Sequence, residues 1–195
     1  IAQTEQGAAS IGGRNNNVSG IFAISAGGQN HTVSGGRAGI FAGSGSTASG
    51  EGAIVLGGST NTASGDHSYV LGFNGTASEK YAIATGAYSK SDVIGKKAHA
   101  SGRFGIVTGS AQGGQFILRA DTTDATATDL TTNNSTPAYS NQISLLNHSA
   151  YAFHGTIVAR ESGANGTECA AWRIEGLIRR ENGQASTVLV NSATT

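Results

Sequence analysis

Hydrophobic and small residues recur over about residues 6–110 at an interval of 14 to 15 residues. The interval is marked by Val-Ser-Gly and Ala-Ser-Gly tripeptides, which end at Gly20, Gly35, Gly50 and Gly65, and by a related Ala-Ser-Glu that ends at Glu79. Chance does not hold a three-residue motif in register over four units, and a fixed short period is typical of solenoids. The pattern predicts an all-β chain whose residues 1–112 form a glycine-rich parallel β-solenoid, or β-roll, of about seven 14–15-residue turns.

Each unit is interpreted as two short strands with glycine at both corners. A turn that closes in about 15 residues needs positive φ at its corners, and glycine adopts positive φ without a Cβ clash. Stacked turns pair in parallel about 4.8 Å apart. Seven turns therefore form a rod on the order of 30–35 Å long, without contacts between distant repeats.

The first strand of each unit is apolar on both faces. Its inner face carries small residues, namely Ala8, Ala23, Ala38, Ala53, Ser68 and Ala82, with Ser10, Ser25, Ile40, Val55, Val70 and Ala84. Its outer face is bulkier and carries Ala9, Ile24, Gly39, Ile54, Tyr69 and Ile83, with Ile11, Ala26, Phe41, Leu56, Leu71 and Thr85. A strand that is apolar on both faces must be covered on both, and soluble monomers rarely expose a continuous apolar row. We therefore expect identical copies of the chain to meet along this row around a common axis, with an interface formed by Ile24, Phe41, Ile54, Leu56, Tyr69, Leu71 and Ile83.

The second strand of each unit has one apolar face and one hydroxyl-rich face. The inward residues are Val18, Val33, Ala48, Ala63 and Ala77. Asn17 and the threonines Thr32, Thr47, Thr62 and Thr76 flank them on one side, and Ser19, Ser34, Ser49, Ser64 and Ser78 on the other. This pattern is typical of a solvated outer wall, and the alternative is a regular ligand platform, including an ice-binding surface.

The small-x-small-x-Gly units resemble the head repeats of trimeric autotransporter adhesins. That family forms left-handed parallel β-rolls in which three chains pack around one axis, so the resemblance implies a trimer at an extracellular bacterial surface. It covers about residues 6–110. The family's usual turn has 14 residues, whereas four units here have 15.

After Gly113-Gly114 the glycine period stops, and residues 113–195 are read as alternating strands separated by turn-rich segments. This pattern predicts an antiparallel β-sandwich-like module, incomplete or completed by a neighbouring subunit. The segments QFILRADTTDATATDL, YAFHGTIVARES and AAWRIEGLIRRENG resemble the C-terminal region of tail-fibre and virion proteins of tailed bacteriophages. The resemblance covers roughly residues 115–190 and implies a tail or head fibre at the virion surface, in contact with other virion proteins.

Composition and motifs give little reason to expect catalysis or a cofactor. Lysines plus arginines equal acidic residues at 12 each, and a neutral chain is a poor partner for nucleic acid. No run of 18 apolar residues occurs, so membrane insertion is not expected. The five histidines, at 31, 67, 99, 148 and 154, lack the spacing of a metal site. We expect no metal, no cofactor and no enzymatic activity.

Three further single residues carry expectations. Cys169 is the only cysteine, which excludes an intrachain disulfide and indicates a small buried side chain. Trp172, the only tryptophan, is expected to anchor the core of the C-terminal module, although an exposed ring would stack on a sugar. Tyr139 follows Pro137 in a loop and is the second candidate for glycan contact. The chain begins at Ile1 and has no methionine, so we expect a fragment or a processed product.

The leading hypothesis is a structural virion fibre or spike whose tip binds a bacterial cell-surface glycan, since three weak sites on a trimer gain avidity. A bacterial trimeric adhesin head is the alternative. An ice-binding solenoid is a further alternative, which the Thr-Ala-Ser triplets suggest. A capsule depolymerase is the fourth hypothesis, and no recognisable catalytic motif supports it.

Overall fold

The structure, a computed structural model, describes residues 2–3, 6–163 and 166–194. Within these residues the chain is all-β, with one 3-10 turn, η1 (Gln184–Ser186), as its only helical element. The chain divides into two compact units, residues 1–143 and residues 144–195. The predicted all-β class and the predicted parallel solenoid are confirmed.

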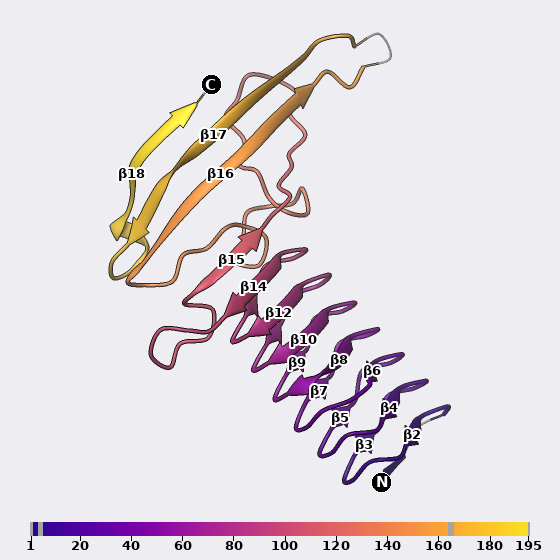
Figure 1. The fold of residues 1–195 in the computed structure, drawn as a ribbon. Coiled ribbons are helices and arrows are strands. Elements are labelled where there is room, and N and C mark those ends of the chain that lie inside the picture. The colour runs from indigo at the N-terminus through magenta and orange to yellow at the C-terminus, as the bar shows by residue number, and fades with distance from the viewer. Residues whose placement is uncertain (1, 4–5, 164–165, 195) are drawn as a thin grey trace. The chain divides into compact units, whose positions relative to one another are not determined.

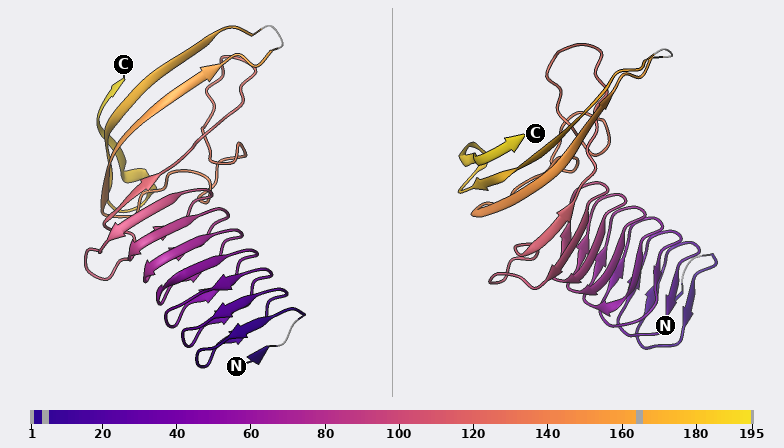
Figure 2. Two further views of the ribbon diagram at one scale, coloured as in Figure 1. Left: turned by 45° about the vertical axis from the view of Figure 1, so that its right-hand side comes forward. Right: turned by 45° about the horizontal axis from the view of Figure 1, so that its top comes forward.

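The first unit is built from two parallel sheets that run along a stack of turns (Figure 1). The short-strand sheet contains β1 (Ala2–Gln3), β3 (Asn17–Val18), β5 (Thr32–Val33), β7 (Thr47–Ala48), β9 (Thr62–Ala63), β11 (Thr76–Ala77) and β13 (Lys90–Ser91). The long-strand sheet contains β2 (Ala9–Ile11), β4 (Ile24–Ala26), β6 (Gly39–Ile40), β8 (Ile54–Ser59), β10 (Tyr69–Phe73), β12 (Ile83–Ala87) and β14 (Lys97–Ser101). Each strand pairs with its counterpart in the next turn, so equivalent residues of successive repeats stack on one another (Figure 2).

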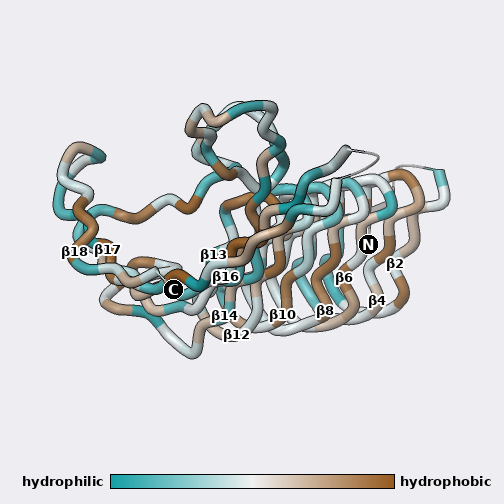
Figure 3. The backbone as a smooth tube through the Cα atoms, turned by 90° about the horizontal axis from the view of Figure 1, so that it is seen from above, coloured by the Kyte–Doolittle hydropathy of each residue, from teal (hydrophilic) through white to brown (hydrophobic). Residues whose placement is uncertain are grey.

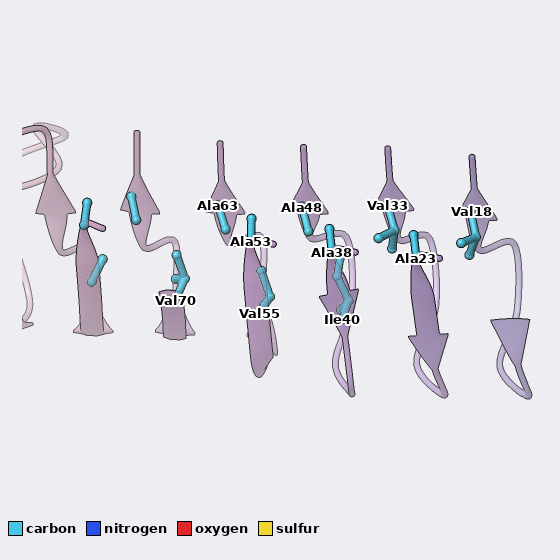
Figure 4. Packing of buried hydrophobic residues seen from close by; sticks show 13 residues of the cluster. Val18, Ala23, Val33, Ala38, Ile40, Ala48, Ala53, Val55, Ala63 and Val70 are labelled. Carbon is cyan, nitrogen blue, oxygen red and sulfur yellow. The ribbon is translucent and has the colours of Figure 1, made fainter. Parts of the chain in front are cut away.

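The solenoid interior is a narrow double row of small side chains between the two sheets. Val18, Val33, Ala48, Ala63 and Ala77 point inward from the short-strand sheet and are fully buried. Ala23, Ala38, Ile40, Ala53, Val55, Val70, Ala82 and Ala84 meet them from the long-strand sheet (Figure 4). The predicted inner face is therefore confirmed from Ala23 onward, and Ile40 is the largest fully buried side chain. The predicted solvated flanks are confirmed in part: five of the ten residues are exposed, namely Asn17, Thr32, Ser34, Ser49 and Ser64, and the other five are half-buried, namely Ser19, Thr47, Thr62, Thr76 and Ser78.

The glycines of the Ser-Gly motif are needed for close backbone packing, which corrects the predicted reason. Gly20, Gly35, Gly50 and Gly65 do not have positive φ. A Cβ on any of them would overlap the backbone carbonyl of the equivalent residue in the next turn. A second ladder has both constraints, because its members have positive φ and would also overlap the next turn: Gly13, Gly28, Gly43, Gly58, Gly72 and Gly86.

Positive φ also occurs at two corners of each turn, where the residue is usually not glycine. One corner holds Phe22, Arg37, Gly52, His67, Tyr81 and Gly95, and the other holds Asn15, Asn30, Gly45, Thr60, Asn74 and Tyr88. The backbone N–H at these positions donates to a carbonyl of the preceding turn, as Thr60 does to Ser44 at 2.9 Å and His67 to Glu51 at 2.7 Å. Asparagine tolerates this conformation, whereas a β-branched residue such as Thr60 is strained in it. Tertiary hydrogen bonding thus fixes the corners, and the glycine pattern alone does not locate them.

The change from 15-residue to 14-residue turns takes place at a single bulge. Val70 pairs with Val55, but the next residue, Leu71, pairs with Gly57. Leu56 is therefore an extra residue in β8, as in other β-bulges. After this point β10, β12 and β14 pair over five residues without interruption.

The last turn of the solenoid is closed by the chain that follows it. Residues 102–111 leave β14 and return as β15 (Gln112–Gln115), which pairs with β14 in antiparallel orientation. The Gln112 side chain accepts a hydrogen bond from the Lys90 N–H at 2.7 Å and donates one to the Lys90 carbonyl at 2.9 Å. These bonds replace the pairing that a further turn would give to β13, and they protect an exposed strand edge. The Ile94 N–H also donates to the Ser140 carbonyl at 2.7 Å, so the first compact unit extends past the predicted boundary at residue 112.

The second unit contains one antiparallel sheet in the order β16 (Ser149–Arg160), β17 (Cys169–Arg180) and β18 (Thr187–Thr194). The antiparallel strands expected here are present. The described residues of the second unit form no second sheet, so the sandwich-like arrangement is not completed within this unit. Alternate residues of β16 are only half-buried, and no residue of the three strands is buried.

Candidate assembly interface

An apolar row lies on the outer face of the long-strand sheet. Parallel pairing places Ile24, Gly39, Ile54, Tyr69 and Ile83 in one line along successive turns. Phe41, Leu56 and Leu71 are 42%, 43% and 43% exposed. The seven residues Ile24, Phe41, Ile54, Leu56, Tyr69, Leu71 and Ile83, called the outer row below, lie outside the core. Six of them belong to strands of this sheet, and Phe41 directly follows β6. Figure 3 shows hydrophobic backbone segments that recur along these strands. The structure brings together every residue predicted for the trimer interface, and the trimer itself stays a prediction.

The outer row changes character at both ends. Ile11, which is 62% exposed, extends it toward the N-terminus. Toward β14 the equivalent positions become polar, because Lys97 pairs with Ile83 and His99 pairs with Thr85. The Thr85 hydroxyl and His99 Nδ1 lie 3.0 Å apart, within hydrogen-bond distance. The apolar contact surface is thus confined to the turns from β2 to β12.

A hollow runs beside the outer row over the last turns of the solenoid. The hollow is lined by three glycines, by apolar residues and by three polar residues, namely Gly58, Gly72 and Gly86, then Leu71, Phe73, Ala87 and Ala100, and then Ser59, His99 and Ser101. A Cβ on any of the three glycines would overlap the next turn, so this line of the surface carries no side chains. Leu71 and Phe73, each 43% exposed, flank the glycines on either side along β10. We call this hollow the glycine groove.

Aromatic and cationic side chains gather at the corners of the later turns. Phe73 and Tyr88 meet edge to face with ring centroids 5.2 Å apart, and the Arg103 guanidinium lies 4.0 Å from the Tyr88 centroid. At the other corner His67 stacks on Tyr81 at 5.8 Å, and the Lys80 ammonium lies 5.1 Å from the Tyr81 centroid. Sequence reasoning missed both clusters. The available signal was the 14-residue spacing of His67 and Tyr81.

A ladder of buried polar side chains runs inside one corner of the solenoid. Asn16 Oδ1 accepts a hydrogen bond from the His31 N–H at 3.1 Å, and His31 Nδ1 accepts one from the Ser46 N–H at 3.3 Å. The Ser46 hydroxyl then accepts from the Asn61 N–H at 3.2 Å. Burial lowers the pKa of His31 below its ordinary value of 6.5. His31 is therefore a neutral structural link in this ladder.

A charged cluster lies at the end of the solenoid around Asp92. Its carboxylate is 3.0 Å from Lys96 Nζ and 3.2 Å from Lys90 Nζ. Burial acts to raise the pKa of Asp92, but the attraction and hydrogen bonds of Lys96 and Lys90 outweigh it, so the pKa is lowered. The same carboxylate, together with burial, raises the pKa of Glu79. A carboxylate that pairs with two lysines is satisfied, and this cluster has the character of a structural clamp.

The two candidates for glycan contact lie in different compact units. Tyr139, 56% exposed, belongs to the irregular segment of the first unit, and Trp172, 41% exposed, lies in β17 opposite Ile157. Trp172 is thus not the buried anchor that was expected, because the described residues of the second unit include no second sheet to cover it. Cys169 is also exposed rather than buried, for the same reason.

The described residues give no sign of a metal centre or a membrane-spanning helix. No three or more His, Cys, Asp or Glu side chains gather there as a group that could hold a metal ion. No helix in the same part of the chain has the length and apolarity needed to span a membrane. No protein-family model matches the sequence, and the comparisons with curated proteins and with solved structures find no match.

Proposed function

We propose that this chain is the shaft-forming subunit of a fibre, a structural protein that assembles as a homotrimer along the outer row. The observation that carries the proposal is the exposure of Phe41, Leu56 and Leu71 on the outer side of successive turns of a solenoid whose own core is already filled. The core is already filled by other side chains, so the outer row cannot turn inward. Another surface must therefore cover it. Threefold packing around the row buries the same face of every copy and leaves the hydroxyl-rich wall in water.

The proposed setting is a virion fibre or spike, with a bacterial adhesin head as the alternative setting for the same shaft. The likeness of the C-terminal segments to phage fibre proteins supports the first setting, and the 14–15-residue repeat supports the second. In both, the solenoid sets distance and the C-terminal module contacts a surface glycan. The open sheet β16–β18 supports this role, because its exposed aromatic and aliphatic residues are available to a sugar or to a neighbouring subunit.

The mass of the native particle tests the assembly. Sedimentation equilibrium or mass photometry is expected to give three times the 19.5 kDa chain mass. A stable, dispersed single chain at micromolar concentration would overturn the proposal, since the outer row would then be permanently in water.

A glycan array tests the recognition half separately. The trimer is expected to retain a subset of bacterial surface glycans, and Trp172→Ala or Tyr139→Ala is expected to weaken retention if that residue stacks on the sugar. If the array shows no binding at any valency, the receptor-binding role is refuted, and the proposal of a trimeric shaft still stands.

Ice binding is a second candidate that one observation favours. Thr32, Thr47, Thr62 and Thr76 pair in register along the short-strand sheet, which gives a regular line of hydroxyl and methyl groups. Thermal hysteresis of the purified protein tests it, and Thr62→Leu is the variant expected to abolish it. A freezing point equal to that of buffer dismisses this candidate.

A further inference from the structure

An apolar loop tip projects from the end of the solenoid, between β14 and β15. Phe104, Ile106 and Val107 are 74%, 85% and 50% exposed, and no charged residue lies between positions 104 and 111. We call these three side chains the apolar tip. Ile106 is among the most exposed large hydrophobic side chains of the described chain, which a solvated loop does not require.

The apolar tip is held in a defined shape rather than left as a loose loop. The Ser110 hydroxyl accepts a hydrogen bond from the Phe104 N–H at 2.8 Å and donates to the Val107 carbonyl at 2.7 Å. Arg103 donates to the Ile106 carbonyl at 3.0 Å while its guanidinium covers the Tyr88 ring. A rigid apolar projection loses little entropy when it docks, so it is suited to insertion into a partner.

The glycine groove offers the complementary shape. Its three glycines carry no side chains, Leu71 and Phe73 flank them on β10, and it is continuous with the outer row through Leu71. Ser59, His99 and Ser101 add polar groups at its two ends. The groove spans β8 to β14. The tip begins directly after Ser101 at the end of β14, and the Gly109 N–H ties it to the Tyr88 carbonyl at 2.8 Å. Tip and groove therefore lie at overlapping heights along the same rod.

We infer that the apolar tip of one chain inserts into the glycine groove of the adjacent copy in the trimer, an inference that rests on the proposed function. A cyclic assembly rotates each residue about the axis without shifting it along the axis, so a projection can only meet a groove at its own height. The tip and the groove satisfy this condition. The contact is heterologous, with one tip and one groove used per chain, and it closes after three copies. This contact also fixes the axial register of the three solenoids. Contacts along the apolar row alone would let one solenoid slide along another.

Cysteine crosslinking tests the contact in a Cys169→Ser background. Chains carrying Ile106→Cys are coexpressed with chains carrying Ala87→Cys, so that a bond between these positions can only join two chains. Mild oxidation is expected to give a covalent dimer of mixed chains on a denaturing gel. In the matched control, Ser34→Cys on the opposite wall replaces Ala87→Cys and is expected to give none. A double variant, Ile106→Cys with Ala87→Cys in one chain, is expected to give covalent trimers. An intrachain bond without a change in mass would overturn the inference.

A substitution series supplies an independent measurement. Phe104→Ser with Ile106→Ser is expected to weaken self-association at least tenfold, whereas Ile117→Ser is expected to leave it unchanged. Ile117 is a fair control because it is 79% exposed and lies outside the tip. Circular dichroism checks that both variants keep the solenoid. A parent trimer with unaltered association in the tip variant overturns the inference and leaves the proposed function standing. A monomeric parent overturns both.

Discussion

The solenoid and the C-terminal sheet treat their apolar side chains in opposite ways. The solenoid fills a core of its own, in which Val18, Ile40 and Val55 have no exposed surface, and keeps a second apolar row outside it. The strands β16 to β18 bury none of their described residues completely. A two-sided coil can thus fold on local contacts between turns, whereas a single three-stranded sheet needs a partner surface for independent stability. The difference indicates that the first unit is self-sufficient in folding and that the second depends more on assembly.

Of the substitutions that test this difference between the units, alanine at a solenoid glycine should have the largest effect on stability. Gly50→Ala places a Cβ against the backbone of Gly65, which cannot move without shifting the whole stack, and we expect a loss of about 3–5 kcal/mol in unfolding free energy. Gly155→Ala in β16 is the matched control, because its Cβ would lie 3.5 Å from Ile174 in ordinary contact. We expect a change within about 0.5 kcal/mol there.

Two probes separate the units in this experiment. Trp172 is the only tryptophan, so its fluorescence reports on the second unit, while amide hydrogen exchange reports on the solenoid turns. Equal losses for Gly50→Ala and Gly155→Ala would contradict the claim that close turn packing is specific to the solenoid.

Serine in the outer row should have the next largest effect, on association rather than on folding. Leu56→Ser with Leu71→Ser removes two exposed apolar contacts per chain, and we expect self-association to weaken about 100-fold or more. The chain should still fold, because neither residue belongs to the core. Analytical ultracentrifugation over a concentration series measures the change.

Val158→Ser tests whether the second unit also contributes to self-association. Val158 is 72% exposed in β16, and no effect is expected if the solenoid alone drives assembly. Weaker association in this variant would show that the second sheet is also buried between subunits. An outer-row variant that associates like the parent would refute the interface.

The sequence allowed the solenoid to be predicted because its evidence is repeated in every turn. Inner positions such as Ala38 and Val55 and outer positions such as Leu71 alternate with a period of two, and parallel pairing makes each assignment depend on its neighbours. The role of the motif glycines was not predictable in the same way. Gly50 is needed because a Cβ there would overlap the carbonyl of Gly65 in the next turn. This contact joins residues that are far apart in sequence, whereas the predicted reason, positive φ, is a local property of one residue.

The apolar tip and the pairing of Phe73 with Tyr88 were beyond sequence reasoning for a related reason, whereas an incomplete C-terminal module was among the expectations. Phe104 and Ile106 lie within residues 6–110, where a further turn was expected, but the structure ends the repeat at β14 and places both residues in the connection to β15. The pairing of Phe73 with Tyr88 depends on a corner conformation that tertiary hydrogen bonds impose. Alternation in β16 predicted a covered face, but the surface that would cover it is not part of the described chain.

Acidification should weaken the solenoid through His31. Burial lowers the pKa of His31 in the folded chain, so the unfolded chain binds more protons near its ordinary value of 6.5. The stabilisation is therefore complete above that pH and is lost as the pH falls below it. His31→Asn provides the control, because asparagine already occupies the equivalent ladder positions 16 and 61. Denaturant midpoints between pH 7.5 and pH 5 should fall less for His31→Asn than for the parent chain, and equal slopes would contradict the assignment.

The smallest expected effect is a gain in stability at a single corner. Thr60 is β-branched, exposed and held at a φ of 57°, a conformation that costs an L-residue roughly 1–2 kcal/mol and glycine nearly nothing. Glycine also enlarges the unfolded ensemble by about 0.4–1 kcal/mol, so the net gain for Thr60→Gly should be about 0.5–1 kcal/mol. Thr62→Gly, two residues later in β9, is the matched control and should destabilise the solenoid by about 0.5–1 kcal/mol, because strand geometry gives glycine no advantage there. Opposite signs at positions 60 and 62 in the same unfolding assay would show that the corner carries strain that assembly of the turns holds in place. A loss of stability at both positions would mean that the Thr60 corner is not strained.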